Sequence, residues 1–164
     1  MKKIVLTGAA GRLGSYLREP LLRLAQELVS SDIIESIGTL HPNETYLRAD
    51  LSDLSAMIDL LKGADMVVHF GAIGDEAPFD AILQANIVGA YNIWEAAHQN
   101  GVKRVVYASS IHAVGMHKKT DFIGTDVPHR PDTYYGLAKC FAEDLASLYW
   151  DKRGLESVCM RILS

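Results

Sequence analysis

The sequence predicts an α/β protein built on a doubly wound parallel sheet of the Rossmann type. Short apolar segments alternate with longer helical patterns, which is typical of a parallel sheet covered by helices on both faces. The first apolar segment runs directly into Thr-Gly-Ala-Ala-Gly-Arg-Leu-Gly, a glycine-rich run typical of a phosphate-binding turn. A small or polar residue also follows each apolar segment, at the edge where such sheets bind ligands.

Six strands are expected, each closed by one of these small or polar residues. In chain order they cover residues 4–6, 27–31, 45–49, 66–70, 104–108 and 157–163. The residues that follow them are Gly8, Asp32, Asp50, Gly71, Ser110 and Ser164. Because the carboxyl ends of parallel strands share one edge, these residues are expected to lie close together.

Four helices are expected between the strands, at residues 13–26, 54–62, 79–99 and 133–153. The third has the clearest helical periodicity, because Phe79, Ile82 and Trp94 belong to one apolar stripe that should pack on the sheet. Pro20 lies inside the first helix, where it removes a hydrogen bond and clashes with the preceding turn, so we expect a kink or break. The aperiodic segment 116–132 is long for a connection and is expected to be a functional loop beside the site.

Composition indicates one soluble domain, residues 1–164, that acts on small molecules. The chain has 164 residues, 49% of them hydrophobic and 22% charged, which is ordinary for a globular protein. Its net charge of -4 offers no basic surface for nucleic acid or for an anionic membrane. Two cysteines, with no disulfide or metal spacing, and no membrane-spanning run favour a cytoplasmic protein. The histidines predict no metal site.

The glycine run is expected to hold the pyrophosphate of a dinucleotide. Gly8 would permit the tight turn, Gly11 would let the backbone approach the phosphates, and Gly14 would let the helix close on the strand. Arg12 and Leu13, within the same run, are also expected to contact the cofactor. The alternative is a glycine-rich turn with no ligand.

Two aspartates favour NAD as the cofactor. Asp32 lies 24 residues after Gly8, where its carboxylate could accept both ribose hydroxyls and would repel the 2'-phosphate of NADP. Asp50 could accept from the adenine amino group. The alternatives are an ordinary solvated carboxylate for Asp32 and a cap on the next helix for Asp50.

Tyr135 and Lys139 indicate a dehydrogenase. Four residues apart on a helix, they share a face, so the ammonium could favour the ionised phenol. A free tyrosine titrates near pH ~10, so a base working near neutrality needs a pKa lower by about 2 to 3. Lys139 and a positively charged nicotinamide are together expected to supply that. Ser110 would polarise the substrate oxygen. The alternative is that Ser109 and Ser110, as serines at a strand end, only cap backbone groups.

Two further residues are candidates for binding. Asn86 has poor helix propensity in the middle of an expected helix, so it either bridges backbone and water near Lys139 or is tolerated on a wet face. His112 follows Ser110 and could donate to a substrate hydroxyl or carboxylate, or it could be a loop histidine without a ligand.

These motifs, in this order, resemble the extended short-chain dehydrogenase/reductase superfamily. The resemblance rests on the glycine run, Asp50-Leu51, Asn86, Ser110 and the Tyr135 to Lys139 segment. Within the superfamily the chain most resembles the uronate dehydrogenases, through the stretches His-Phe-Gly-Ala-Ile-Gly, Ala-Ser-Ser-Ile-His-Ala-Val-Gly, Asp-Val-Pro-His-Arg-Pro-Asp and Tyr-Gly-Leu-Ala-Lys-Cys-Phe.

The resemblance implies NAD-dependent oxidation of glucuronate or galacturonate at the anomeric carbon to an aldarolactone. Tyr135 would be the base, with Ser110 and Lys139 as its catalytic partners, and His112, Gly74 and Ser164 would contact the sugar acid. Leu51, Gly71, Ala72 and Asn86 would contact the cofactor, as would Tyr135 and Lys139. It also implies a homo-oligomer, and a chain truncated after the sixth strand, without the C-terminal substrate-binding portion.

Two other functions stay open. A nucleotide-sugar epimerase, dehydratase or keto-reductase would use the same residues, although such epimerases usually carry a tyrosine where Val114 stands. A dinucleotide-sensing protein would keep the fold without the chemistry. It would not need an activated phenol.

Overall fold

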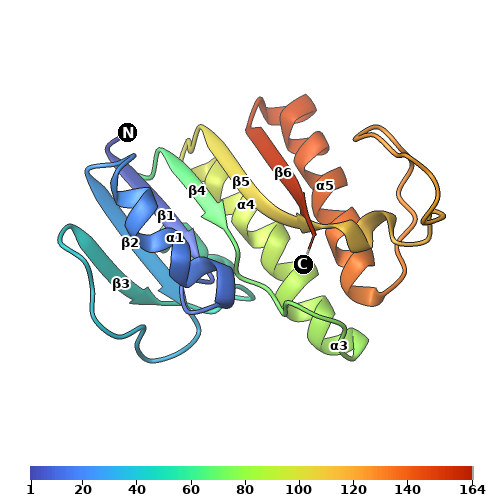
Figure 1. Ribbon diagram of the computed structural model, residues 1–164. Coiled ribbons are helices and arrows are strands. Elements are labelled where there is room, and N and C mark those ends of the chain that lie inside the picture. Colours follow the sequence, from blue (N-terminus) through green and yellow to red (C-terminus); the bar gives the residue numbers. More distant parts are fainter. Residues whose placement is uncertain (164) are drawn as a thin grey trace.

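The computed structural model describes residues 1–163, which form a six-stranded parallel sheet with helices on both faces (Figure 1). The strand order is β3-β2-β1-β4-β5-β6, and every neighbouring pair is parallel. The strands are β1 (Lys3–Thr7), β2 (Glu27–Asp32), β3 (Glu44–Arg48), β4 (Met66–His69), β5 (Arg104–Ser110) and β6 (Glu156–Ile162). All six predicted strands are confirmed, with ends that differ by no more than two residues.

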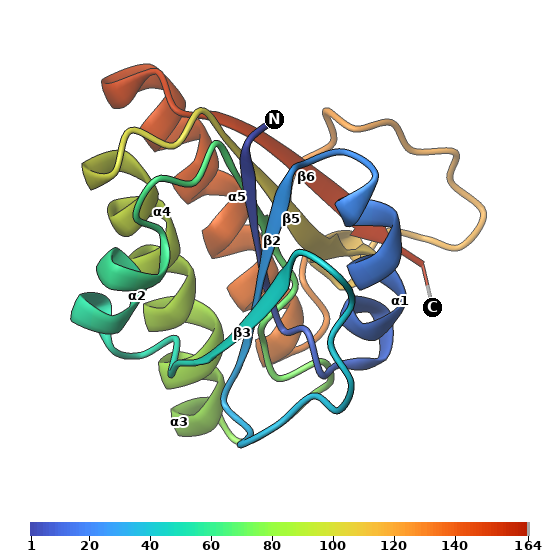
Figure 2. The ribbon, with the colours of Figure 1, turned by 90° about the vertical axis from the view of Figure 1, so that its left-hand side faces the viewer.

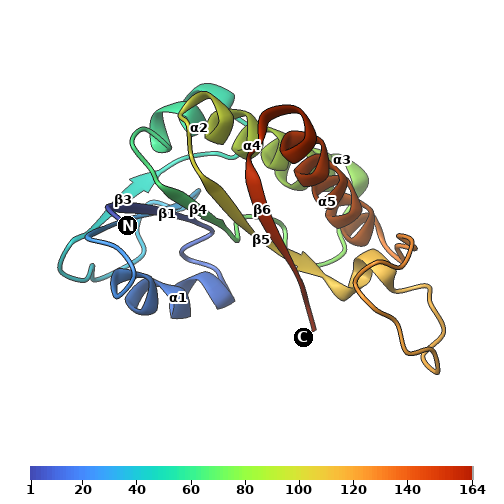
Figure 3. The same ribbon diagram turned by 90° about the horizontal axis from the view of Figure 1, so that it is seen from above.

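The helices lie in two layers, which confirms the doubly wound class. Helix α1 (Arg12–Leu22) covers one face of the sheet, while α2 (Leu54–Leu60), α4 (Gly89–Gln99) and α5 (Tyr134–Arg153) cover the other (Figures 2 and 3). None of the helices in residues 1–163 combines the length and apolar character that crossing a membrane requires.

Alternate side chains of the strands point to opposite faces of the sheet and pack in two separate hydrophobic cores. Val5 of β1 faces α2, α4 and α5 and belongs to the larger core, which contains the fully buried Trp94. Ile4 and Leu6 point to the opposite face and pack with Leu21 of α1. This period of two explains why the central strand β1 is apolar from Ile4 to Leu6, since both of its faces are covered.

The predicted helix 79–99 is interrupted. It consists of α3 (Phe79–Ile82), a π-helical turn η1 (Leu83–Val88) and α4. The apolar stripe continues through all three, so hydrophobic periodicity could not reveal the wider turn. Such π-turns often occur at functional sites, and this one contains the buried Asn86.

Helix α1 is shorter than predicted and ends at Leu22, with Pro20 in its last turn. The amides of Arg23 and Leu24 then bond to the carbonyls three residues before them, Pro20 and Leu21, which closes the helix with a tighter turn. The break expected at the proline is therefore a helix end two residues beyond it.

The aperiodic segment 116–132 contains no helix or strand and projects from the side of the molecule. Its two ends are joined, because the amide of Met116 bonds to the carbonyl of Arg130 at 2.9 Å and the amide of Arg130 bonds to the carbonyl of Ala113 at 2.9 Å. The segment thus returns to its starting point, beside the 3-10 helix η2 (Ile111–Val114) and the first turn of α5.

Candidate active site

A cleft of about 580 Å³ opens at the carboxyl ends of β1, β2 and β4. The order of strands reverses between β1 and β4, and doubly wound sheets bind their ligands at such a point. Seven of the predicted cofactor contacts line this cleft, namely Gly8, Gly11, Asp32, Asp50, Leu51, Gly71 and Ala72. Its walls also contain apolar side chains that sequence reasoning missed, among them Ile33, Ile34 and Ile73.

Gly8 and Gly14 are required by close backbone contacts. Gly8 has a φ of +73°, and a Cβ there would lie 2.5 Å from the amide nitrogen of Gly71. A Cβ on Gly14 would lie 2.0 Å from the carbonyl oxygen of Gly8. The tight turn and the close helix-to-strand packing expected of these two glycines are therefore confirmed. Arg12 and Leu13 begin α1 with exposed side chains and do not line the cleft.

Asp32 joins the end of β2 to the glycine turn. Its Oδ2 accepts a hydrogen bond of 2.9 Å from the amide of Ala10, and its Oδ1 accepts one of 2.8 Å from the amide of Ile33. Each carboxylate oxygen keeps a further lone pair, so the group can still accept from hydroxyl groups of a ligand in the cleft.

Asp50 does not cap helix α2, so that alternative is wrong. The cap is Asp53, whose carboxylate accepts from the amide of Ala56. Asp50 instead accepts from the amide and the hydroxyl of Ser52, at 2.9 and 2.8 Å, which holds its carboxylate at the cleft.

Asn86 is buried and fixes the backbone beside the cleft, so the wet-face alternative is wrong. Its Oδ1 accepts from the amide of Ile73 at 2.8 Å and its Nδ2 donates to the carbonyl of Ile73 at 2.9 Å. Asn86 is not one of the residues that line the cleft. It positions Ile73, which does.

Tyr135 and Lys139 lie one turn apart near the start of α5 and share a side of the helix. Lys139 is buried, with Nζ 5.0 Å from the centre of the Tyr135 ring and 4.7 Å from that of Tyr107. Nζ donates a hydrogen bond of 2.7 Å to the carbonyl of Ala108 in β5. Burial lowers the pKa of Lys139 to about 8, so the ammonium remains the main form at pH 7.

The protein's own groups do not lower the pKa of the Tyr135 phenol, and the lowering expected from Lys139 together with a bound nicotinamide stays a prediction. Burial raises its pKa above the ordinary 10.0, a hydrogen bond with Ser110 opposes the rise, and the carboxylate of Asp75 adds to it. The hydrogen bond of Lys139 Nζ goes to the Ala108 carbonyl, and its charge lies over the face of the tyrosine ring. Spacing on the helix placed the two groups together but did not fix where the ammonium would point.

The two serines at the end of β5 have different partners. Ser110 is buried, its hydroxyl accepts from the amide of His112 at 3.2 Å, and it interacts with Tyr135. Ser109 donates to Glu143 of α5, on the other side of the strand. Ser110 is therefore the serine that faces the tyrosine.

Beside Tyr135, residues from three other segments come together. His112 of η2 packs edge-to-face on the Tyr135 ring, with centroids 5.7 Å apart, and its Nδ1 lies 2.8 Å from Oδ1 of Asp132. Glu76, from the loop after β4, accepts from the amides of Tyr134 and Tyr135 at 3.2 and 2.9 Å. Sequence reasoning missed Asp132 and Glu76, because only the fold brings these loops to the helix.

One predicted substrate contact remains outside this cluster. Gly74 is exposed in the loop before Glu76, and a Cβ there would meet nothing within 4 Å. Ser164 lies outside the described residues. Within residues 1–163 no group of three or more His, Cys, Asp or Glu side chains is arranged to hold a metal ion.

Comparison with known proteins identifies the family. The model of the NAD-dependent epimerase/dehydratase family matches residues 4–164. The chain belongs to this family. The resemblance to extended short-chain dehydrogenases is therefore confirmed, and the family is one of NAD-dependent proteins.

The relatives and solved structures of this family that the chain resembles include uronate dehydrogenases. The chain is 44% identical to uronate dehydrogenase of Pseudomonas putida over 160 residues, 98% of this chain and 60% of that protein. The structure of glucuronic acid dehydrogenase from Chromohalobacter salexigens is 47% identical with a TM-score of 0.96, over 99% of this chain and 61% of that one. A mutant uronate dehydrogenase of Agrobacterium tumefaciens complexed with NAD is 44% identical with a TM-score of 0.92, over 96% and 59%. The chain thus spans about three fifths of the length of these relatives.

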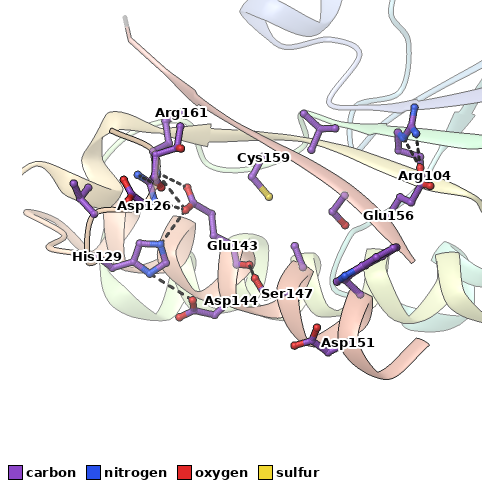
Figure 4. A pocket seen from close by; sticks show the side chains of 16 residues that line it. Arg104, Asp126, His129, Glu143, Asp144, Ser147, Asp151, Glu156, Cys159 and Arg161 are labelled. Atoms are coloured by element: carbon purple, nitrogen blue, oxygen red, sulfur yellow. Dashed lines mark hydrogen bonds and ion pairs between the residues drawn. The ribbon is translucent and has the colours of Figure 1, made fainter. Parts of the chain in front are cut away.

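A second groove, with a volume of about 930 Å³, lies between β6 and α5, away from the switch point (Figure 4). Glu143 of α5 lies at one end of it and binds three donors. Arg161 of β6 reaches it at 2.7 Å, His129 of the segment 116–132 at 2.9 Å, and Ser109 donates from β5. The carboxylate therefore fastens that segment to the sheet and helix that hold Ser110 and Tyr135.

Glu143→Gln should lower the free energy of unfolding by about 3 kcal/mol, because it leaves the largely buried Arg161 without its counter-charge. Urea unfolding measures the loss. Glu156→Gln is the matched control, since the Arg104 pair it breaks is about half exposed, and it should cost less than about 1 kcal/mol. Equal losses in the two variants would contradict the role given to Glu143.

Proposed function

We propose that the protein is an NAD-dependent dehydrogenase that oxidises a hexuronic acid, glucuronate or galacturonate, at C1 to the aldarolactone. The observation that carries the proposal is the set formed by the half-buried Tyr135 and the buried Ser110 and Lys139, at the sheet edge that also holds the switch-point cleft. The similarity to uronate dehydrogenases supports the substrate class.

The residues of the cleft fit a dinucleotide. Gly8 and Gly14 have no room for a side chain, so the backbone turn can lie against a pyrophosphate. The free amides at the N-terminus of α1 favour the negative charge of that pyrophosphate. Asp32 would accept from the adenine ribose hydroxyls and repel a 2'-phosphate, and Asp50 would face the adenine side. When bound, NAD accepts the hydride that leaves C1 of the sugar.

Side chains of the protein would remove the proton of the C1 hydroxyl group. Tyr135 as phenolate would take the proton of the C1 hydroxyl, while Ser110 holds the same oxygen by a hydrogen bond. Lys139 keeps a positive charge over the tyrosine ring and would also hold the nicotinamide ribose. Since burial and the Asp75 carboxylate raise the pKa of Tyr135, a bound nicotinamide with its positive charge would have to supply the lowering that a phenolate base needs.

The oligomeric state and the cellular location are proposals as well. Helix α5 exposes apolar side chains at Leu137, Phe141 and Leu148, which a second copy could cover in a homo-oligomer. Cys140 and Cys159 are free thiols, which suits a reducing cytoplasm.

Formation of NADH by the full-length protein tests the substrate. We expect it with glucuronate or galacturonate, and not with glucose or galactose, which lack the carboxylate. Turnover with a UDP-sugar but not with the free acids would favour the epimerase or keto-reductase alternative. NAD binding without turnover of any of these sugars would favour the sensor.

A further inference from the structure

Asp132 contacts His112, the histidine that packs on the Tyr135 ring. It lies at the end of the segment 116–132, directly before Thr133, which caps helix α5. Its Oδ1 is 2.8 Å from His112 Nδ1 and accepts from the hydroxyl of Thr133 at 3.2 Å. A Cβ on Gly115 would lie only 2.2 Å from Oδ2, so the carboxylate occupies the space that the glycine leaves. The position of this carboxylate is therefore set from two sides.

The carboxylate of Asp132 decides which ring nitrogen of His112 carries hydrogen. Partial desolvation of the carboxylate raises the pKa of Asp132, but the hydrogen bond with His112 outweighs this and holds that pKa below its ordinary value. An ionised carboxylate can only accept hydrogen bonds, so the hydrogen must lie on His112 Nδ1. The other nitrogen, Nε2, of the neutral ring then has a free lone pair.

His112 has little freedom in its remaining contacts. Its amide donates to the hydroxyl of Ser110, and its carbonyl lies where a Cβ on Gly136 would approach to 2.3 Å. The ring rests edge-to-face on Tyr135. Backbone, ring plane and Nδ1 are thus all fixed against parts of the proposed active site, and Nε2 is the polar atom of the ring left for a substrate.

We propose that Asp132 is a positioning residue that fixes the tautomer and plane of His112, so that Nε2 accepts a hydrogen bond from a hydroxyl of the sugar acid. This assignment rests on the proposed function. It separates two roles left open by the sequence, because a nitrogen lone pair attracts a hydroxyl hydrogen and repels a carboxylate. His112 therefore recognises a hydroxyl of the sugar, and the carboxylate of the sugar acid binds elsewhere.

The tautomer can be measured without any substrate. The ¹⁵N chemical shifts of the His112 ring, assigned by their loss in His112→Gln, should show a protonated Nδ1 and an unprotonated Nε2 in the wild type at neutral pH. Asp132→Ala should move the hydrogen to Nε2, the usual tautomer in water. A wild-type ring with its hydrogen on Nε2, or an Asp132→Ala spectrum that is unchanged, would overturn the proposal.

Kinetics on the full-length protein give the second readout. Asp132→Ala should lower kcat/KM for the sugar acid about tenfold to a hundredfold, the effect of losing one good hydrogen bond, with the KM for NAD unchanged. Asp132→Asn keeps an acceptor oxygen and should lose less. Asp126→Asn removes the same charge from an exposed part of the same segment and is the matched control.

The outcomes separate this inference from the function on which it rests. If the wild type does not oxidise uronates, the proposed function fails. If the wild type is active and Asp132→Ala is as active as Asp126→Asn, the function stands and the role of Asp132 is wrong.

Discussion

Tyr135→Phe is expected to lower kcat for uronate oxidation by about 10²- to 10⁴-fold, the usual contribution of a general base. The substitution keeps the ring that packs on His112 and lies beneath the Lys139 ammonium, and it removes only the phenol oxygen. The affinity for NAD should stay within about twofold, because the residues that line the switch-point cleft do not include Tyr135. Stopped-flow formation of NADH and fluorescence titration with NAD measure the two quantities.

The neighbouring tyrosine provides the matched control. Tyr134 is about half exposed, packs on Phe79 with ring centroids 5.4 Å apart, and has Ala138 rather than a lysine one turn further along. Tyr134→Phe should therefore retain nearly full activity. A Tyr135→Phe enzyme with more than about a tenth of the wild-type kcat would remove the phenol from the mechanism.

The sequence predicted the fold and seven of the residues that line the cleft, because both depend on local patterns. Apolar strands, the glycine turn and the i, i+4 spacing of Tyr135 and Lys139 are all visible within a few residues of chain. The same reasoning failed for the π-turn around Asn86, because an apolar stripe reads alike through an α-helix and a π-turn.

The remaining parts of the site depend on contacts between distant segments. Asp132 and Glu76 act on His112 and α5 across 20 and 58 or more residues of chain, so no local pattern marks them. The pKa of Tyr135 in the protein alone could not be predicted either, because it depends on burial and on the direction of the Lys139 ammonium. Both are properties of the folded chain.

His69 is expected to make the protein sensitive to acid. The ring is fully buried at the end of β4, stacked on Tyr107 with centroids 5.4 Å apart. Its Nδ1 lies 2.7 Å from the hydroxyl of Thr7, which also accepts from the amide of Gly71 at 3.3 Å. Thr7 can then give its one hydrogen to Nδ1, so the ring is neutral with its hydrogen on Nε2.

Burial, with the nearby charge of Lys139, lowers the pKa of His69 from 6.5 to about 3. Below pH 6.5 the unfolded chain binds a proton at His69 that the folded protein does not, so stability falls as the pH falls. The neutral ring therefore contributes its full stability above pH 6.5, and this stability is lost progressively as the pH falls to about 3. At about 1.4 kcal/mol per pH unit, the total loss would be roughly 5 kcal/mol. At pH 5 the expected loss is about 2 kcal/mol.

His69→Asn isolates this effect from the carboxylates that also titrate in acid. The amide oxygen of asparagine can still accept from Thr7, but the side chain cannot be protonated, so the variant should lose about 2 kcal/mol less than the wild type between pH 7 and pH 5. Urea unfolding at each pH measures the difference. His41→Gln, at a half-buried histidine before β3, is the matched control and should keep the wild-type slope. If the unfolding free energy fell equally with pH in the wild type and in His69→Asn, His69 would take up its proton in the folded protein as it does in the unfolded chain. The proposal of a neutral His69 ring that supports Thr7 and Gly71 beneath the cleft would then be wrong.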